Sequence, residues 1–284
     1  MVKALMVAGA TSDAGKTLLS AALCRHFSQK GYRVAPFKTL NISLNAYSTA
    51  DGKEIGISQA FQAWAAGIEP AACMNPILIK PHAPGRCQYV VCGRPVDMPE
   101  HEGMREDLME RAAACYRKVA AMADIVICEG SGSPAEPNLR DRDLANMRTA
   151  RMAGAPVLLV GDIDAGGVFA GIYGTWALLA QEDRALVKGY IINRFRGDPS
   201  VLGPGIDELS RRMGCPCLGV VPYVPLRFPA EDSCSLRNTD VPSGGNDDMR
   251  AVWISNLDRF LEVVRASLDL GTIERILGEG IHGL

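Results

Sequence analysis

No apolar run in this sequence approaches the roughly 18 consecutive residues that a membrane-spanning helix needs. An excess of basic charge is missing too, because 30 Lys and Arg residues face 32 Asp and Glu residues, for a net charge of −2. We therefore expect no membrane and no nucleic acid as partner. Internal repeats and low-complexity tracts are also absent. The four histidines lie far apart along the chain and suggest no cluster of metal ligands.

The spacing of the nine cysteines does not suggest a disulfide framework, because they are odd in number and scattered through apparent strands and helices. Cys215 and Cys217 form the one close pair, but no second pair or nearby histidine completes a zinc site. The pattern is typical of reduced, mostly buried thiols and predicts a cytoplasmic protein. The apolar N-terminus leads directly into a glycine-rich loop, so we interpret it as a strand rather than a signal peptide.

The sequence does contain ample material for a core, since 48% of its residues are hydrophobic and 22% are charged. Short apolar segments alternate with helical periodicity over most of the chain. This alternation predicts an α/β fold with a mostly parallel, doubly wound sheet covered on both faces. Strands are expected near residues 3–8, 33–37, 77–80, 88–92, 124–129, 156–162, 187–193 and 216–221, and helices near 16–29, 55–66, 104–122, 143–153, 168–180 and 204–213.

Three segments follow from this pattern. Residues 1–225 are predicted to form one large domain. Residues 226–249 are rich in Pro, Ser, Asp, Asn and Gly, which is typical of a linker or a mobile surface segment. Residues 250–284 are expected to add a strand (250–254) and an amphipathic helix (257–270) that pack back on the same domain, because they are too few to bury a core alone.

The stretch from Gly9 to Thr17, Gly-Ala-Thr-Ser-Asp-Ala-Gly-Lys-Thr, lies between the first strand and the first helix. Its glycines let the backbone N–H groups point at a polyphosphate, and the helix N-terminus adds a partial positive charge. Lys16 can reach the β- and γ-phosphates of ATP, and the Thr17 hydroxyl can hold Mg²⁺. The spacing exceeds the common G-x4-G-K-[ST] form by one residue, so a glycine turn beside a solvated lysine is the alternative. The predicted nucleotide contacts are Gly9, Ser12, Asp13, Ala14, Gly15, Lys16, Thr17 and Leu18.

Polar residues also follow the later strands, whose carboxyl ends are where ligands bind in open parallel sheets. Lys38 ends the second strand and can neutralise charge during phosphoryl transfer, although strand-end lysines are often merely solvated. Glu129 ends the apolar strand before Gly130 and can hold Mg²⁺, with a helix-capping or surface role as the alternative. Glu54 is a further candidate carboxylate for the metal.

Three more clusters are expected at this edge. The loop from Asn138 to Asp143 alternates both charges, which indicates either a solvated surface or a substrate site. Asp162 and Asp164 end another strand before a glycine turn. Asn193 ends the next strand, where it can contact a base edge or simply form a turn.

The motifs 37–45, 74–81, 129–143, 162–169, 192–198 and 218–223 together resemble the ATP-dependent synthetase domain of the cobyric acid synthase family. The resemblance covers about residues 1–236. It extends more loosely to dethiobiotin synthetase, which shares the longer phosphate loop, the second-strand lysine and the strand-end glutamate. The resemblance therefore implies a P-loop NTPase fold of the dethiobiotin synthetase-like type over residues 1–225.

The same resemblance implies an ATP-dependent amidoligase of cobalamin biosynthesis. Such an enzyme activates carboxylates of a corrinoid, of the cobyrinic acid a,c-diamide type or related, as acyl phosphates that ammonia then converts to amides. The implied catalytic residues are Lys16, Lys38, Asp141, Asp143 and Asp164; the implied Mg²⁺ shell is Thr17, Glu54 and Glu129; and the implied adenine contacts are Asn193 and Pro222. The implied substrate contacts are Asn41, Ser43, Asn45, Ser131, Asn138 and Arg140.

The sequence departs from the family pattern in several places. No Gly-x-Cys-x-Gly nucleophile turn of a glutamine-hydrolysing domain occurs, so ammonia is expected from solution or from a separate glutaminase subunit. Ala165, Leu40 and Ile57 stand where the family leads us to expect Arg, Gln and Arg. Two alternatives stay open: a nucleotide-dependent switch like the partitioning ATPases, and a dethiobiotin-synthetase-like carboxylase. A homodimer is the expected assembly.

Overall fold

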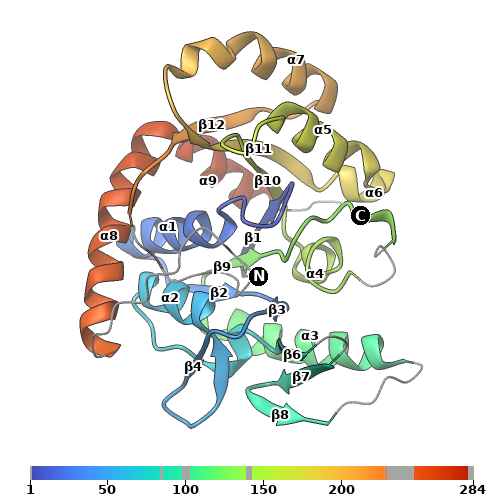
Figure 1. The fold of residues 1–284 in the computed structure, drawn as a ribbon, viewed down its shortest axis with the longest axis vertical. Coiled ribbons are helices and arrows are strands. Elements are labelled where there is room, and N and C mark those ends of the chain that lie inside the picture. Colours follow the sequence, from blue (N-terminus) through green and yellow to red (C-terminus); the bar gives the residue numbers. More distant parts are fainter. Residues whose placement is uncertain are drawn as a thin grey trace.

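Six parallel strands form the central sheet of the computed structural model, which describes residues 2–83, 86–97, 103–138, 143–226, 228 and 246–280. The strand order is β12-β11-β10-β1-β9-β2 (Figure 1). The strands are β1 (Lys3–Gly9), β2 (Val34–Phe37), β9 (Ile125–Glu129), β10 (Val157–Asp162), β11 (Val187–Phe195) and β12 (Cys217–Pro222). Because all six run the same way, their carboxyl ends share one edge. The predicted parallel α/β fold is confirmed.

Helices cover both faces of this sheet, and β1 shows why. Leu5 and Val7 point into one apolar cluster, whereas Ala4, Met6 and Ala8 point into the other. Alternate residues of a strand face opposite sides, so a strand buried on both faces must be apolar throughout. The first cluster is covered by α1 (Lys16–Gln29), α2 (Ile57–Ala65), α8 (Asn246–Ser267) and α9 (Leu270–Glu279), and the second by α3 (Met104–Met122), α4 (Met147–Ala153), α5 (Val168–Leu178) and α7 (Gly203–Met213).

A second, smaller sheet lies beside the carboxyl end of β2. Its order is β3-β6-β7-β8, from β3 (Leu40–Ile42), β6 (Ile77–Ala83), β7 (Arg86–Val91) and β8 (Arg94–Val96). A hairpin of β4 (Ala46–Ser48) and β5 (Glu54–Gly56) leads into α2. Short helical turns complete the fold at Ala72–Met74, Gln181–Arg184 (α6) and Pro199–Leu202. This sheet carries the segment that follows Lys38.

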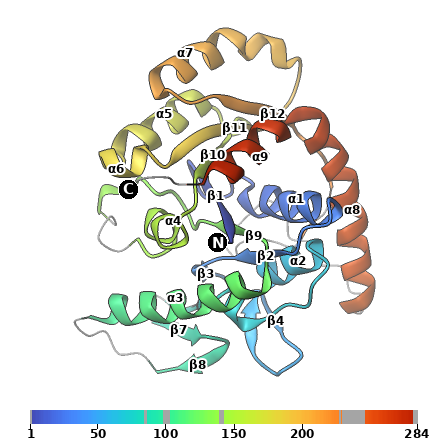
Figure 2. The ribbon, with the colours of Figure 1, turned by 180° about the vertical axis from the view of Figure 1, so that it is seen from behind.

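The expected strand at 250–254 is wrong, because α8 spans these residues. Leu257, Phe260, Leu261 and Val264 are buried at helical spacing against the first cluster, and this burial decides the conformation of the segment. Figures 1 and 2 both show α8 alongside α1, with α9 on the same side of the sheet. Most of the predicted linker, residues 227 and 229–245, lies outside the described residues. Among the described residues, no helix is long and apolar enough to cross a membrane.

Candidate functional site

The loop between β1 and α1 is built around two glycines. Gly15 has a φ of +90° and directly precedes α1, and a Cβ there would lie 2.2 Å from Asn193 Nδ2. A Cβ on Gly9 would lie 2.7 Å from the Thr11 carbonyl oxygen and 3.0 Å from Lys16 Nζ. Side chains at either position would distort the loop, so the structure requires glycine at both ends of it. This cradle fits the phosphates of a nucleotide.

Lys16 and the start of α1 supply the charge for that cradle. The Lys16 side chain is buried, and its Nζ donates a 3.2 Å hydrogen bond to the Thr11 carbonyl across the loop. Within α1, which is described throughout, the first turn holds no acidic residue and no side chain caps the helix. The first N–H groups of a helix need acceptors, and an anion satisfies them. Of the other predicted contacts, Ser12 is exposed, Ala14 is buried and Leu18 packs partly against the core.

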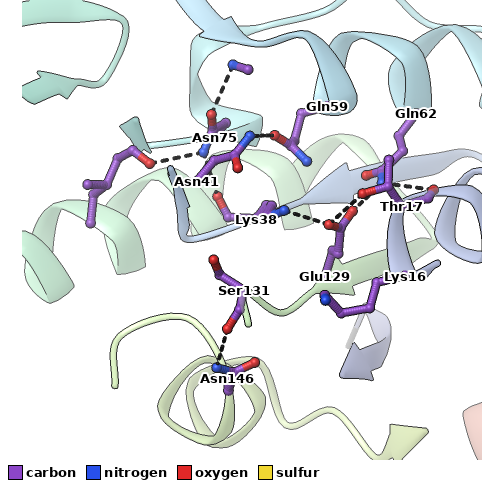
Figure 3. Close-up of polar contacts among 12 residues, drawn as sticks. Lys16, Thr17, Lys38, Asn41, Gln59, Gln62, Asn75, Glu129, Ser131 and Asn146 are labelled. Carbon is purple, nitrogen blue, oxygen red and sulfur yellow. Dashed lines mark hydrogen bonds and ion pairs between the residues drawn. The ribbon is translucent and has the colours of Figure 1, made fainter. Parts of the chain in front are cut away.

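Glu129 is the centre of the site (Figure 3). Its side chain is fully buried, and its Oε1 accepts hydrogen bonds from Thr17 Oγ1 at 2.8 Å and Lys38 Nζ at 2.6 Å. The structure thus brings together three residues that the sequence places 112 and 91 positions apart. The carboxylate and hydroxyl oxygens are ligands that suit Mg²⁺. Thr17 and Glu129 are therefore the residues that fit the predicted metal, with Lys38 beside them.

Gln62, on α2, is one functional candidate that was not predicted from the sequence. Its Nε2 donates to Glu129 Oε2 and, at 3.2 Å, to the carbonyl oxygen of Thr17. Both partners are acceptors, so the amide nitrogen must face them and Oε1 must face away. That Oε1 is buried without a hydrogen-bond partner among the described residues. Gln62 thus contacts one oxygen of the Glu129 carboxylate and Lys38 contacts the other.

Buried amides hold the strand-end lysine in place. Asn75 Nδ2 donates to the carbonyl oxygens of Lys38 at 3.0 Å and Ile77 at 3.1 Å, and its Oδ1 accepts from Gly56 N at 3.0 Å. Asn41, a predicted substrate contact, is buried and donates to Gln59 Oε1 at 2.9 Å. These contacts join the small sheet to the start of α2 (Figure 3). Asn75 is a second functional candidate that the sequence analysis missed.

The other predicted substrate and metal residues near β3 make local contacts. The Ser43 hydroxyl is buried and accepts from the backbone N–H of Asn45 at 3.0 Å. Glu54, on β5, forms an ion pair with Lys80 of β6. This ion pair links the β4–β5 hairpin to the small sheet, whereas Thr17 and Glu129 are in direct contact with each other. The role of Glu54 as a metal ligand stays a prediction.

Asp143 caps α4. Its Oδ1 accepts from the N–H groups of Ala145 at 3.2 Å and Asn146 at 2.9 Å, and its Oδ2 accepts from Met147 N at 2.9 Å. This bonding explains why the helix begins at Met147 rather than at residue 143. Asn146 in turn donates to the Ser131 carbonyl at 2.8 Å and ties the cap to the loop after β9. Asn138 is exposed, and Arg140 and Asp141 lie outside the described residues.

Side chains at the end of β11 donate hydrogen bonds to the backbone of the phosphate loop. Asn193 Nδ2 donates to the Ala14 carbonyl at 2.9 Å, so the structure shows this amide holding the loop. Arg194 NH1 donates to the Asp13 carbonyl at 2.6 Å and pairs with Asp162 at 2.8 Å. In the sequence, Arg194 could have been recognised as a candidate because it directly follows Asn193, a predicted strand-end residue. The nucleotide loop is therefore held by two consecutive side chains of β11.

A second arginine, Arg196, follows directly after β11. Arg196 pairs with Asp164 at 2.9 Å, and its guanidinium carbon lies 3.4 Å from the ring centre of Tyr223. Asp164, predicted to be catalytic, is therefore already paired with a cation. Pro222 ends β12 next to Tyr223 and is exposed. A contact of Pro222 with adenine stays a prediction.

The buried charge of Glu129 also affects a neighbouring thiol. Burial first, and the negative charge of Glu129 second, raise the pKa of Cys24 on α1 well above its usual range. Burial likewise raises the pKa of the Cys128 thiol to about 12. Both thiols stay protonated at neutral pH, so neither provides an anionic ligand or nucleophile beside the site.

These features define a P-loop nucleotide-binding domain. A glycine-rich loop precedes a helix, the loop ends in the buried Lys16, and Thr17, the next residue, contacts the strand-end carboxylate of Glu129. Residues 5–233 match the family model "CobQ/CobB/MinD/ParA nucleotide binding domain". The chain belongs to this family, and nucleotide binding follows from that membership.

Curated proteins that are similar to this chain include cobyric acid synthases. The enzyme of Pelotomaculum thermopropionicum is 46% identical over 99% of this chain and 54% of its own length. A probable cobyric acid synthase of Methanocella arvoryzae is 52% identical over 95% of this chain and 58% of its own length. The chain thus spans about half the length of the curated relatives it matches. Among solved structures, the GDP complex of the receptor FtsY from Elizabethkingia anophelis aligns at 16% identity over 78% of this chain and 57% of that chain, with a TM-score of 0.47, too low to bear on function.

Proposed function

We propose that this chain is the ATP-dependent half of an amidoligase that acts on a corrinoid carboxylate. The observation that carries the proposal is Glu129 in contact with Thr17 and Lys38 at the mouth of the phosphate loop. Similarity to cobyric acid synthases supports the substrate class. ATP is the proposed nucleotide, since a carboxylate is a poor acyl donor until one of its oxygens leaves as phosphate.

The proposed reaction has two steps. A substrate carboxylate oxygen attacks the γ-phosphorus, ADP leaves, and an acyl phosphate forms. Ammonia then attacks the acyl carbon and expels inorganic phosphate, which leaves an amide. Lys16 and Lys38 stabilise the negative charge on the transferring phosphoryl group. Thr17 and Glu129 would hold Mg²⁺, which neutralises phosphate charge when it is bound.

We propose the other predicted roles on the same basis. Asp141, Asp164 and the polar segment from Asn41 to Asn45 would border the substrate, and Asp143 would order the loop beside it. Ammonia would come from solution or from a separate glutaminase. A homodimer is the proposed assembly, which light scattering would test. A cytoplasmic location is proposed as well, and the odd number and scattered spacing of the nine cysteines in the sequence support it.

The test is turnover of cobyrinic acid a,c-diamide with Mg·ATP and free ammonium. We expect phosphate release coupled to a stepwise mass decrease, one step for each carboxyl that becomes an amide. Lys38→Met should lower the rate on the order of 100-fold or more. Lys188→Met, which changes an exposed lysine of β11, is the matched control and should leave the rate unchanged.

Two other results would redirect the proposal. Phosphate release without any change in substrate mass, together with tight ATP binding, would favour the nucleotide-dependent switch. Turnover of diaminopelargonic acid with bicarbonate, but not of the corrinoid, would favour the carboxylase.

A further inference from the structure

Two cysteines outside the nucleotide site face each other at van der Waals distance. Cys92 lies in the turn between β7 and β8, and Cys115 lies on α3. Their Sγ atoms are 3.5 Å apart, and one thiol donates to the other. Cys115 is buried, whereas Cys92 is partly exposed, so a small oxidant can reach Cys92 first. None of the residues of the proposed ATP site belongs to this pair.

The surroundings of the pair are basic. Arg111, Cys115 and Lys118 are spaced by four and three residues on α3 and therefore share one face of the helix. The Cys115 S–H donated to its sulfur first, and the positive charges of Arg111 and Lys118 next, lower the pKa of Cys92 to about 6. The thiolate is the reactive form of cysteine, so Cys92 is the nucleophile of the pair.

The backbone holds Cys92 in this position. Its φ is +51°, a left-handed conformation that is uncommon for a residue with a side chain. Its N–H donates to the Pro76 carbonyl at 2.7 Å, and the next carbonyl, of Gly93, accepts from Glu54 N at 3.0 Å. A Cβ on Gly93 would lie 2.6 Å from Lys53 Cβ and 2.7 Å from Ala72 Cβ, so the turn is packed tightly against its neighbours.

We propose that Cys92 and Cys115 are a redox-active thiol pair that a peroxide oxidises reversibly to a disulfide, linking the small sheet covalently to α3. The Cys92 sulfur attacks one peroxide oxygen, the O–O bond breaks, and water leaves after proton uptake, which yields a sulfenic acid. The Cys115 sulfur then attacks the Cys92 sulfur, and the hydroxyl leaves as a second water with the Cys115 proton. Two thiols and one hydrogen peroxide thus give one disulfide and two waters. The sulfurs must approach by about 1.5 Å to reach bonding distance.

The experiment uses the full chain, freed of reductant and treated with a small excess of hydrogen peroxide, followed by alkylation and peptide mapping. We expect loss of two of the nine thiols, loss of two hydrogen masses, and a cross-linked peptide joining Cys92 to Cys115 that dithiothreitol releases. In the untreated protein, Cys92 should react with N-ethylmaleimide on the order of tenfold faster than Cys73. Cys73 is a nearby, partly buried thiol, and its burial raises its pKa.

Variants separate the two roles. Cys92→Ser should abolish both the sulfenic acid and the cross-link. Cys115→Ala, which suits a buried position better than serine, should abolish the cross-link and leave a sulfenic acid on Cys92 that dimedone traps. Cys73→Ser is the matched control and should keep the cross-link.

Three outcomes would overturn the proposal. The first is a protein that keeps all nine thiols after treatment. The second is a cross-link that uses Cys73 in place of Cys115. The third is irreversible oxidation of Cys92 with no disulfide at any peroxide dose. Because no readout involves ATP or a corrinoid, these outcomes are independent of the proposed function.

Discussion

The buried ion pair of Lys38 and Glu129 makes a quantitative prediction about stability. Glu129→Gln keeps the shape of the side chain but removes the charge that faces Lys38 Nζ at 2.6 Å. The Lys38 side chain is only 4% exposed, so water cannot replace the lost partner. Removing one partner of a buried ion pair costs about 3–5 kcal/mol. We expect the free energy of unfolding of Glu129→Gln to fall by that amount.

Removing the lysine instead of the carboxylate should cost less stability. Lys38→Met leaves the Glu129 carboxylate buried, but Thr17 and Gln62 still donate hydrogen bonds to it. We expect a loss of about 2–3 kcal/mol, because hydrogen bonds to a charged group offset part of the penalty. The double variant has neither charge, so its loss should fall short of the sum of the single losses by about 2 kcal/mol.

Urea unfolding of the nucleotide-free and magnesium-free protein measures these losses, provided that the m-value stays constant across the four proteins. Glu262→Gln is the control, because Glu262 pairs with Arg265 on the surface and its side chain is 72% exposed. Its loss should stay below about 0.5 kcal/mol. Strictly additive losses in the double-mutant cycle would refute the reasoning, since they would mean that the two charges do not interact.

Three further predictions follow from other parts of the molecule. Gly15→Ala and Gly31→Ala both introduce a methyl group at a φ of +90°, but only the methyl group at position 15 would meet another side chain. Titration calorimetry should therefore show ATP affinity falling on the order of tenfold or more in Gly15→Ala and not in Gly31→Ala. Lys30 first, and His26 next, lower the pKa of Glu274 below its usual 4.5. The stability that Glu274 contributes is therefore complete above about pH 4.5 and lost as the pH falls through the lowered value. Glu274→Gln should thus be less stable than the wild type at pH 7, with a difference that narrows in acid; a constant difference would contradict this. Phe260→Ala, within the buried face of α8, should cost about 3–5 kcal/mol in urea unfolding, whereas Val252→Ala on the exposed face should stay within about 0.5 kcal/mol.

Local sequence was sufficient where burial on both faces imposed a simple pattern. The five residues of β9 are all buried, so the strand appears in the sequence as an uninterrupted apolar run up to Glu129. The segment 250–254 misled because Val, Trp and Ile favour strands locally. Its helical state depends on the burial of Phe260 and its neighbours against a core built from residues far away in the sequence, and tertiary contacts of that kind override local preference.

Some residues of the site could likewise be predicted from local sequence, and others could not. Lys38 and Glu129 could be predicted because each ends or follows a parallel strand, and the carboxyl ends of such strands meet at one edge. Thr17 could be predicted because it follows the lysine of the phosphate loop. Gln62 could not, because it lies inside a helix whose pattern indicates only packing. Its contact with Glu129 joins residues 67 positions apart and exists only once α2 is placed over the phosphate loop. Nothing local distinguishes such a residue from an ordinary buried glutamine.

The structure shows the surroundings of Leu40, Ile57 and Ala165, the three positions at which the resemblance led us to expect other residues. Leu40 and Ile57 are partly buried and pack against apolar clusters, so these two positions contribute to the core. At position 165 the expected arginine is absent, but Arg196, which directly follows β11, pairs with Asp164 at 2.9 Å. Alanine at 165 therefore does not leave the carboxylate uncompensated. The positive charge that pairs with Asp164 therefore comes from the segment directly after the neighbouring strand, β11.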